Sequence, residues 1–72
     1  MEFRQLQYFV AVAEEESFSR AAEKMNVSQP SLSKAIQSIE YEYGVTLVKR
    51  TTRSFKLTDA GELIFKQGEK LI

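Results

Sequence analysis

Side chains suited to reading the edges of DNA bases cluster in one short polar segment. Gln29, Ser33 and Lys34 lie within a turn or so of a point where a helix is expected to begin. An ammonium group suits the O6 and N7 acceptors of guanine, and a Gln amide suits adenine. These side chains are therefore predicted to contact base edges in a major groove roughly 12 Å wide. Pro30 is mainly a helix-starting residue, although its ring can also touch a thymine methyl group.

A second cluster, made of basic side chains, occupies residues 44 to 56. Local clusters of this kind, rather than the average charge of a protein, make the contacts to phosphate. Arg53 stands at the expected tip of a hairpin, where it is predicted to enter a minor groove narrowed by A·T runs. On an arbitrary protein, however, such a hairpin is usually only solvated. The segment contains no acid and four cations, which are Lys49, Arg50, Arg53 and Lys56.

Small hydroxyl groups provide further candidate phosphate contacts. Ser17, Ser28 and Ser31 lie where helices are expected to start, beside backbone N–H groups that are suited to bind phosphate. Ser28 also has a plainer role as a helix cap. The full set of predicted phosphate-contacting residues is Ser17, Ser28, Ser31, Gln37, Lys49, Arg50 and Thr51.

The first half of the chain must supply two helices that support these groups. Apolar residues recur at three- and four-residue steps, which predicts a first helix that stops near Ser17. A second helix is expected over residues 18–25, capped by Ser17 and ended by Asn26, which tolerates a left-handed turn. The expected buried positions are Phe3, Leu6, Phe9, Val10 and Ala13 on the first helix, and Phe18, Ala21, Ala22 and Met25 on the second.

The second half predicts a third helix, a small hairpin and a fourth helix. The third helix begins after Ser28 and ends at Gly44, with Leu32, Ala35, Ile36, Ile39 and Tyr43 as its apolar stripe. Short β-prone runs at residues 47–50 and 55–58 flank a polar turn, which is typical of a hairpin. Thr58 then caps a helix that continues to residue 72. Its apolar residues are too many for so small a domain to bury, which predicts a dimerisation surface of Leu63, Ile64, Leu71 and Ile72. The alternative is that Phe65 and part of this stripe pack on the first helix.

These elements predict a mainly α fold, a winged helix-turn-helix with a three-helix core and a two-stranded wing, followed by a linker helix. We expect residues 1–57 to form the winged helix-turn-helix domain. Residues 58–72 are expected to be the truncated start of the linker helix, without the rest of a longer protein.

The composition narrows the chemistry. The 72 residues include no Cys and no His, so zinc sites, thiol active sites and a histidine general base lose their usual residues. We expect no metal, no cofactor and no enzymatic activity. No apolar run approaches the ~18 residues that span a bilayer, and the N-terminus has no signal-peptide stretch. A cytoplasmic protein without a membrane partner, associated with the nucleoid when bound, is therefore expected.

The zero net charge at first argues against a nucleic-acid partner, but it is a sum of opposite regions. Residues 1–16 hold one base and four acids, residues 17–56 seven bases and three acids, and residues 57–72 two bases and three acids. The predicted contact region therefore carries a net charge of +4. This pattern alone leaves duplex DNA binding and its alternatives open. A winged helix that binds another protein is the alternative, and an enzyme built on residues 14–16 is a distant third because no partner base or pocket accompanies them.

Five segments resemble the N-terminal region of LysR-type transcriptional regulators. They are residues 6–14 (LQYFVAVAE), 17–25 (SFSRAAEKM), 27–40 (VSQPSLSKAIQSIE), 44–50 (GVTLVKR) and 57–62 (LTDAGE). The resemblance covers essentially the whole chain, and the joint spacing of the motifs makes it specific.

The resemblance implies a bacterial transcription factor whose dimer reads a dyad-like promoter site in double-stranded DNA. The positions that match Gln29, Pro30, Ser33 and Lys34 face the major groove in that family, and the position of Arg53 reaches the minor groove. The linker helix pairs in an antiparallel homodimer, full-length proteins also form tetramers, and a small-molecule effector binds a C-terminal domain that this chain lacks. Lys34 departs from the Arg that is common at this position in the family. An ammonium cannot make the bidentate contact of Arg, so the preference for guanine at that base is weaker or different. Ser31 and Val48 are milder departures.

Overall fold

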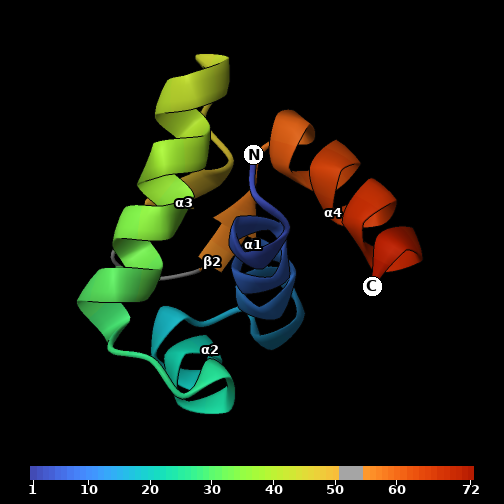
Figure 1. Ribbon diagram of the computed structural model, residues 1–72. Helices are drawn as coiled ribbons and strands as arrows, with labels where there is room; N and C mark the ends of the chain where they lie inside the picture. Colours follow the sequence, from blue (N-terminus) through green and yellow to red (C-terminus); the bar gives the residue numbers. More distant parts are fainter. Residues whose placement is uncertain (51–54) are drawn as a thin grey trace.

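The computed structural model describes residues 1–50 and 55–72, with only the backbone for residue 50. In chain order the elements are α1 (Phe3–Glu15), α2 (Phe18–Met25), α3 (Gln29–Tyr43), β1 (Val48–Arg50), β2 (Phe55–Leu57) and α4 (Asp59–Leu71) (Figure 1). The mainly α winged helix-turn-helix predicted from the sequence is confirmed. The strands are one residue shorter than expected at two ends. Residues 47 and 58 share one backbone hydrogen bond, but the Leu47 N–H donates to Glu40 and the Thr58 carbonyl accepts the Glu62 N–H of α4.

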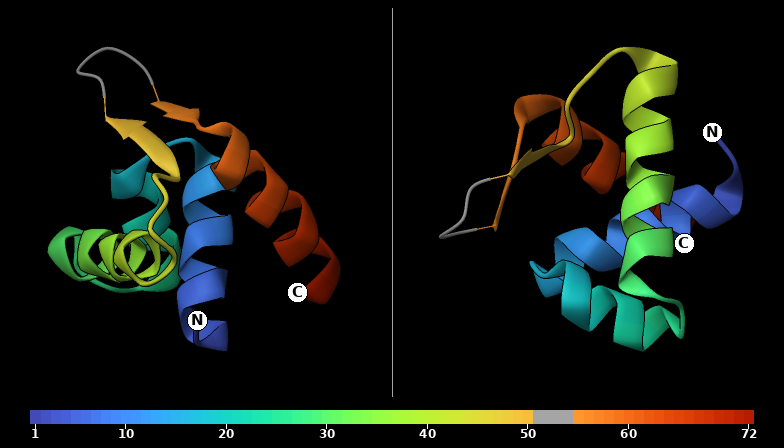
Figure 2. Two further views of the ribbon diagram at one scale, coloured as in Figure 1. Left: turned by 90° about the horizontal axis from the view of Figure 1, so that it is seen from above. Right: turned by 90° about the vertical axis from the view of Figure 1, so that its left-hand side faces the viewer.

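Helix α1 lies at the centre of the molecule and packs against the three other helices. Figure 2 shows α3 on one side of α1 and α4 on the other, so that α4 does not touch the outer face of α3. The core forms where α1, α2, α3 and the start of β1 meet, and Phe9, Leu32, Ile36, Ile39 and Leu47 are among its fully buried side chains. The first turn of α3 is thereby held by packing and its polar side remains outside.

The two helices of the helix-turn-helix begin and end as expected. The Ser17 hydroxyl accepts a hydrogen bond from the Arg20 N–H at 3.2 Å, and Asn26 ends α2 in the left-handed conformation at φ 59°. Ala21 and Ala22 are buried, which allows close approach of the neighbouring helices. Gly44 ends α3 at φ 65°, a conformation that glycine adopts without a steric penalty.

Three glutamates at the end of α1 have two different roles. Lys24 Nζ lies 3.3 Å from Glu14 Oε1 and 3.6 Å from Glu15 Oε2. The hydrogen bond that Lys24 donates to Glu14, followed by the charges of both carboxylates, raises the pKa of Lys24 above its ordinary value. Glu16 is the C-cap of α1 at φ 52°, a left-handed conformation that is costly for a residue with a Cβ.

The wing is an antiparallel pair that packs on α2. Val48 pairs with Leu57 and Lys49 with Lys56. The ring of Phe55 meets that of Phe18 edge to face, with centroids 6.3 Å apart. This contact orients β2 on the first residue of α2, and therefore fixes the wing relative to the helix-turn-helix.

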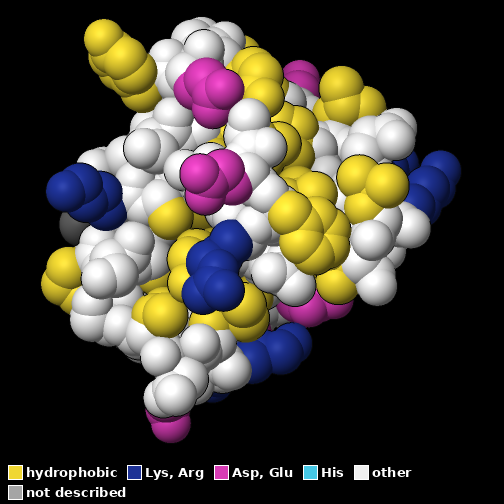
Figure 3. All heavy atoms as spheres, in the orientation of Figure 1, with side chains coloured by type: hydrophobic (Ala, Val, Ile, Leu, Met, Phe, Trp, Pro, Cys, Tyr) yellow, Lys and Arg dark blue, Asp and Glu magenta, His cyan; other side chains and the backbone are white. Residues whose placement is uncertain are grey.

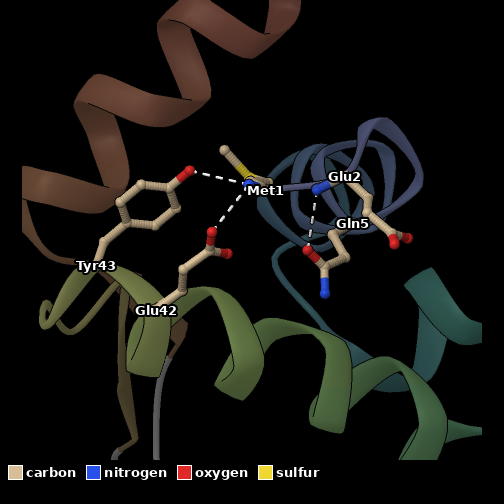
Figure 4. Close-up of polar contacts among 5 residues, drawn as sticks. All are labelled: Met1, Glu2, Gln5, Glu42 and Tyr43. Atoms are coloured by element: carbon tan, nitrogen blue, oxygen red, sulfur yellow. Dashed lines mark hydrogen bonds and ion pairs between the residues drawn. The ribbon is translucent and has the colours of Figure 1, made fainter.

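Two predicted core positions are wrong. Phe3 is 56% exposed and Tyr43 is 50% exposed, because the first turn of α1 and the last turn of α3 project beyond the packed centre. The polar end of Tyr43 has a different use, because its hydroxyl accepts a hydrogen bond from the Met1 amino group at 3.0 Å (Figure 4). The same amino group is 3.2 Å from Glu42 Oε2. These two bonds, that of Tyr43 first, raise the pKa of the amino group above 8.0.

The junction between the wing and α4 is closely packed. Thr58 caps α4 by accepting a hydrogen bond from the Gly61 N–H at 3.0 Å, and its own hydroxyl donates to the Thr46 carbonyl. The Thr58 N–H donates to the Leu47 carbonyl at 3.0 Å. A Cβ added at Gly61 would lie 2.2 Å from that same carbonyl oxygen. A residue with a Cβ fits here only if α4 or the base of the wing shifts.

Candidate nucleic-acid interface

The first turns of α3 present the predicted base-contacting side chains together. Gln29, Pro30 and Lys34 are exposed and Ser33 is half-buried, whereas Leu32 between them is fully buried. Burial of Leu32 fixes the rotation of α3 about its axis. The polar side of the helix thus faces solvent as one surface, which also includes the exposed Gln37 one turn further along.

The hydroxyls at the start of α3 differ in what they can still donate. Ser28 Oγ accepts the Ser31 N–H at 3.2 Å and donates to Ser31 Oγ at 2.8 Å. Its hydrogen is thereby used inside the protein, so Ser28 acts here as a cap. The hydrogen of the exposed Ser31 hydroxyl remains to donate outward. At α2, the Ser17 hydroxyl accepts from the backbone and retains its hydrogen in the same way.

Sequence reasoning missed Ser19 and Glu40. Ser19 Oγ lies 3.2 Å from Gln29 Oε1 and joins the first turn of α2 to the first residue of α3. Glu40 Oε2 accepts the N–H groups of Leu47 and Val48 at 2.8 and 3.4 Å, and so holds the start of β1 against α3. No sequence motif predicts either contact, since each joins separate elements through an ordinary polar side chain.

The wing brings like charges together. Lys49 stands directly opposite Lys56 in the antiparallel register, and both side chains are exposed. Like charges at facing positions destabilise a strand pair, whereas an anion beside them removes that cost. Thr51 and Arg53 lie outside the described residues, as does the side chain of Arg50, so the structure gives no placement for these three predicted contacts.

The predicted dimerisation residues divide between surface and core. Leu63, Leu71 and Ile72 are 61%, 68% and 57% exposed, whereas Ile64 is half-buried and packs against the core. Figure 3 shows several hydrophobic side chains at the surface on the side where α4 lies, as well as elsewhere on this face. An exposed apolar patch on one helix of a small domain is typical of an interface.

Other kinds of site find little support in the part of the chain that the structure describes. Within residues 1–50 and 55–72, no three His, Cys, Asp or Glu side chains are grouped so that they could hold a metal ion. Among the same residues, no helix combines the length and apolar character needed to cross a membrane.

Three helices, a two-stranded wing and an exposed polar helix start define a winged helix-turn-helix domain. Residues 3–62 match the model of the bacterial regulatory helix-turn-helix proteins of the lysR family. The chain therefore belongs to the lysR family, as the sequence motifs predicted.

Relatives and solved structures agree with this assignment. The chain is 50% identical over 72 residues to a probable cat1 operon transcriptional activator of Acinetobacter lwoffii, and spans 24% of its length. It is 57% identical over 63 residues, 88% of the chain, to the HTH-type transcriptional regulator AlsR of Bacillus subtilis, and spans 21% of that protein. These relatives are transcriptional regulators, so the expectation that the chain is not an enzyme is confirmed by comparison.

The similar structures include complexes with DNA. The DNA-binding domain of BenM in complex with catB site 1 DNA has a TM-score of 0.94 and 46% identity, with 99% of this chain and 80% of that chain covered. The CbnR domain in complex with DNA has a TM-score of 0.92 and 41% identity, with 99% and 82% covered.

Proposed function

We propose that this chain binds double-stranded promoter DNA at a specific sequence and so controls transcription. The observation that carries the proposal is the first part of α3, where Gln29, Pro30, Ser33 and Lys34 share one outward surface on a fixed helix. These residue types match the donors and acceptors of the major groove. The strong structural likeness to a domain solved on DNA supports this use of the same surface.

In this proposal, phosphates are held around the reading helix by small donors and by the wing. Ser17 and Ser31 keep hydroxyl hydrogens for donation, and Lys49 supplies a cation from β1. Arg53 is proposed to reach the minor groove, and Arg50 and Thr51 to contact the backbone, on the sequence resemblance alone. The small number of cations keeps non-specific affinity low, because phosphate contacts supply most of it.

We also propose a homodimer that pairs through α4. The exposed Leu63, Leu71 and Ile72 provide the apolar surface, and a two-fold would place two recognition helices about 34 Å apart or a multiple of it. Residues 1–57 would then be the reading domain and residues 58–72 the linker. In the whole protein, a further domain would bind a small-molecule effector and the protein would assemble further in the cytoplasm, on the nucleoid.

Selection of bound fragments from random duplex DNA tests the proposal directly. We expect an inverted repeat with half-sites spaced by whole helical turns. The logarithm of the binding constant should fall linearly with the logarithm of the salt concentration, with a slope of about −0.9 per phosphate contact. Lys34→Ala should change which bases are recovered. Lys70→Ala removes the same charge from α4, far along the chain from α3, and serves as the matched control. Recovery of no preferred sequence, with capture of a partner protein on α3 instead, would favour the protein-binding alternative.

The dimer is tested separately by sedimentation of two surface variants. Leu63→Ser removes an exposed apolar side chain from α4, whereas Tyr41→Ser removes one that is 92% exposed at the far end of α3. Leu63→Ser should weaken self-association and leave the folded monomer intact. Equal self-association of the two variants would contradict a role for α4.

A further inference from the structure

The contact between Ser19 and Gln29 has a consequence for which bases the chain prefers. Ser19 belongs to α2 and Gln29 is the first residue of α3, and their side chains meet at 3.2 Å although both are exposed. Exposed side chains ordinarily remain free, because ordering them costs conformational entropy. A bond at this position therefore restricts a side chain that is proposed to touch a base.

The direction of the bond decides what Gln29 can offer. The Ser19 hydroxyl donates its hydrogen to Oε1, the acceptor atom of the Gln29 amide. The amide has two remaining donors on Nε2 and no hydrogen on Oε1. With Oε1 held toward α2, the Nε2 donors are the part of the group left to face outward.

We propose that Ser19 is a positioning residue that sets the base preference of Gln29, by turning the amide so that Nε2 meets an acceptor edge in the major groove. Guanine presents O6 and N7, and thymine presents O4, as acceptors, whereas cytosine presents the N4 donor. Gln29 thus favours guanine or thymine over cytosine as the base that it contacts directly. An unrestrained Gln would instead suit adenine, whose N6 donor and N7 acceptor require both ends of the amide. This inference rests on the proposed DNA binding.

Base preference at the single position that Gln29 contacts is the measurement that tests the role. Duplexes that differ only at that base pair are compared for Kd with the wild-type chain, Ser19→Ala and Ser19→Thr. We expect Ser19→Ala to lower the discrimination about threefold to tenfold, the range given by the usual net worth of one hydrogen bond. Ser19→Thr retains a hydroxyl and should restore most of it. Melting temperatures should agree among the three, since residue 19 is exposed.

A second variant tests the direction of the bond. Gln29→Glu keeps an oxygen for Ser19 but replaces the outward donor by an acceptor, so the preference should move from guanine or thymine toward cytosine, which offers N4. The double variant Ser19→Ala/Gln29→Ala should discriminate no worse than Gln29→Ala, because Ser19 acts only through Gln29.

The competing outcomes are distinct. If Ser19 instead contacts phosphate, Ser19→Ala will weaken binding to all duplexes equally and leave discrimination unchanged, which overturns the inference. An unchanged preference with unchanged affinity overturns it as well. Absence of any sequence-specific binding by the wild-type chain would instead refute the proposed function, before either serine variant is compared.

Discussion

Replacement of Gly61 by Ala tests whether the backbone contact between α4 and the wing base limits stability. The added Cβ would lie 2.2 Å from the Leu47 carbonyl oxygen and 3.1 Å from its carbonyl carbon. Real Cβ atoms essentially never approach other atoms within 3.0 Å, so the helix must retreat by at least the difference, 0.8 Å. The obstacle is backbone and cannot rotate aside. That oxygen also accepts the Thr58 N–H, so the retreat stretches a hydrogen bond.

The free-energy change follows from these terms. Overpacking costs about 1–3 kcal/mol and the weakened hydrogen bond about 1 kcal/mol. The higher helix propensity of Ala returns about 1 kcal/mol. Gly61→Ala should therefore lower the free energy of unfolding by about 1–3 kcal/mol.

Gly68→Ala is the matched control on the same helix. Its Cβ would meet Val10 Cγ2 at 2.9 Å and Leu6 Cδ1 at 3.0 Å, which are ends of side chains and can shift. The propensity gain then offsets most of the crowding, and stability should stay within about 1 kcal/mol of the parent.

Thermal unfolding followed by circular dichroism measures the difference. For a domain of this size, a gap of about 2 kcal/mol between the variants separates their melting temperatures by roughly 8–16 °C. If Gly61→Ala melts at the same temperature as Gly68→Ala or above it, the steric argument is refuted.

Three further predictions concern charge and conformation. Lys34→Arg should increase the preference for guanine at its base pair, since a guanidinium contacts O6 and N7 together; binding to single-substituted duplexes measures it. Glu16→Gly should raise the free energy of unfolding by about 0.5–1 kcal/mol in urea titrations because φ is 52° there, while Glu16→Gln, which keeps the Cβ, should gain less. The pKa of the Met1 amino group is raised in the fold, so its contribution to stability is present below pH 8.0 and is lost as pH rises through the higher folded value. Tyr43→Phe should move that pKa back toward 8.0 in an NMR titration, and an unchanged value would contradict the assigned cause.

Local patterns accounted for nearly all of the helices. Ser17 and Ser28 marked two helix starts, and Gly44 marked one end, because caps depend on residues adjacent in the chain. Burial was predicted less well where a helix extends past the core. Phe3 and Tyr43 fit the apolar period, but the period does not say where the neighbouring helices end.

The candidate site was predictable in composition and less so in detail. The polar face of α3 followed from the period of the helix. Three contacts did not follow from the sequence, because each depends on how separate elements meet. They are the hydrogen bond of Ser19 to Gln29, the hydrogen bond of β1's start to Glu40, and the close approach at Gly61. The LTDAG segment was recognised as a motif, and the structure supplies the physical reason for its glycine.

The junction at Leu47 also couples α4 to the base of the wing. Its carbonyl oxygen accepts a bond from the residue that caps α4 and lies against the Cα side of Gly61, so neither element can slide there without moving the other. A tilt of α4 would therefore also displace the base of β1. The helix that we propose to pair in the dimer and the wing that we propose to hold DNA are therefore joined through one backbone carbonyl, that of Leu47.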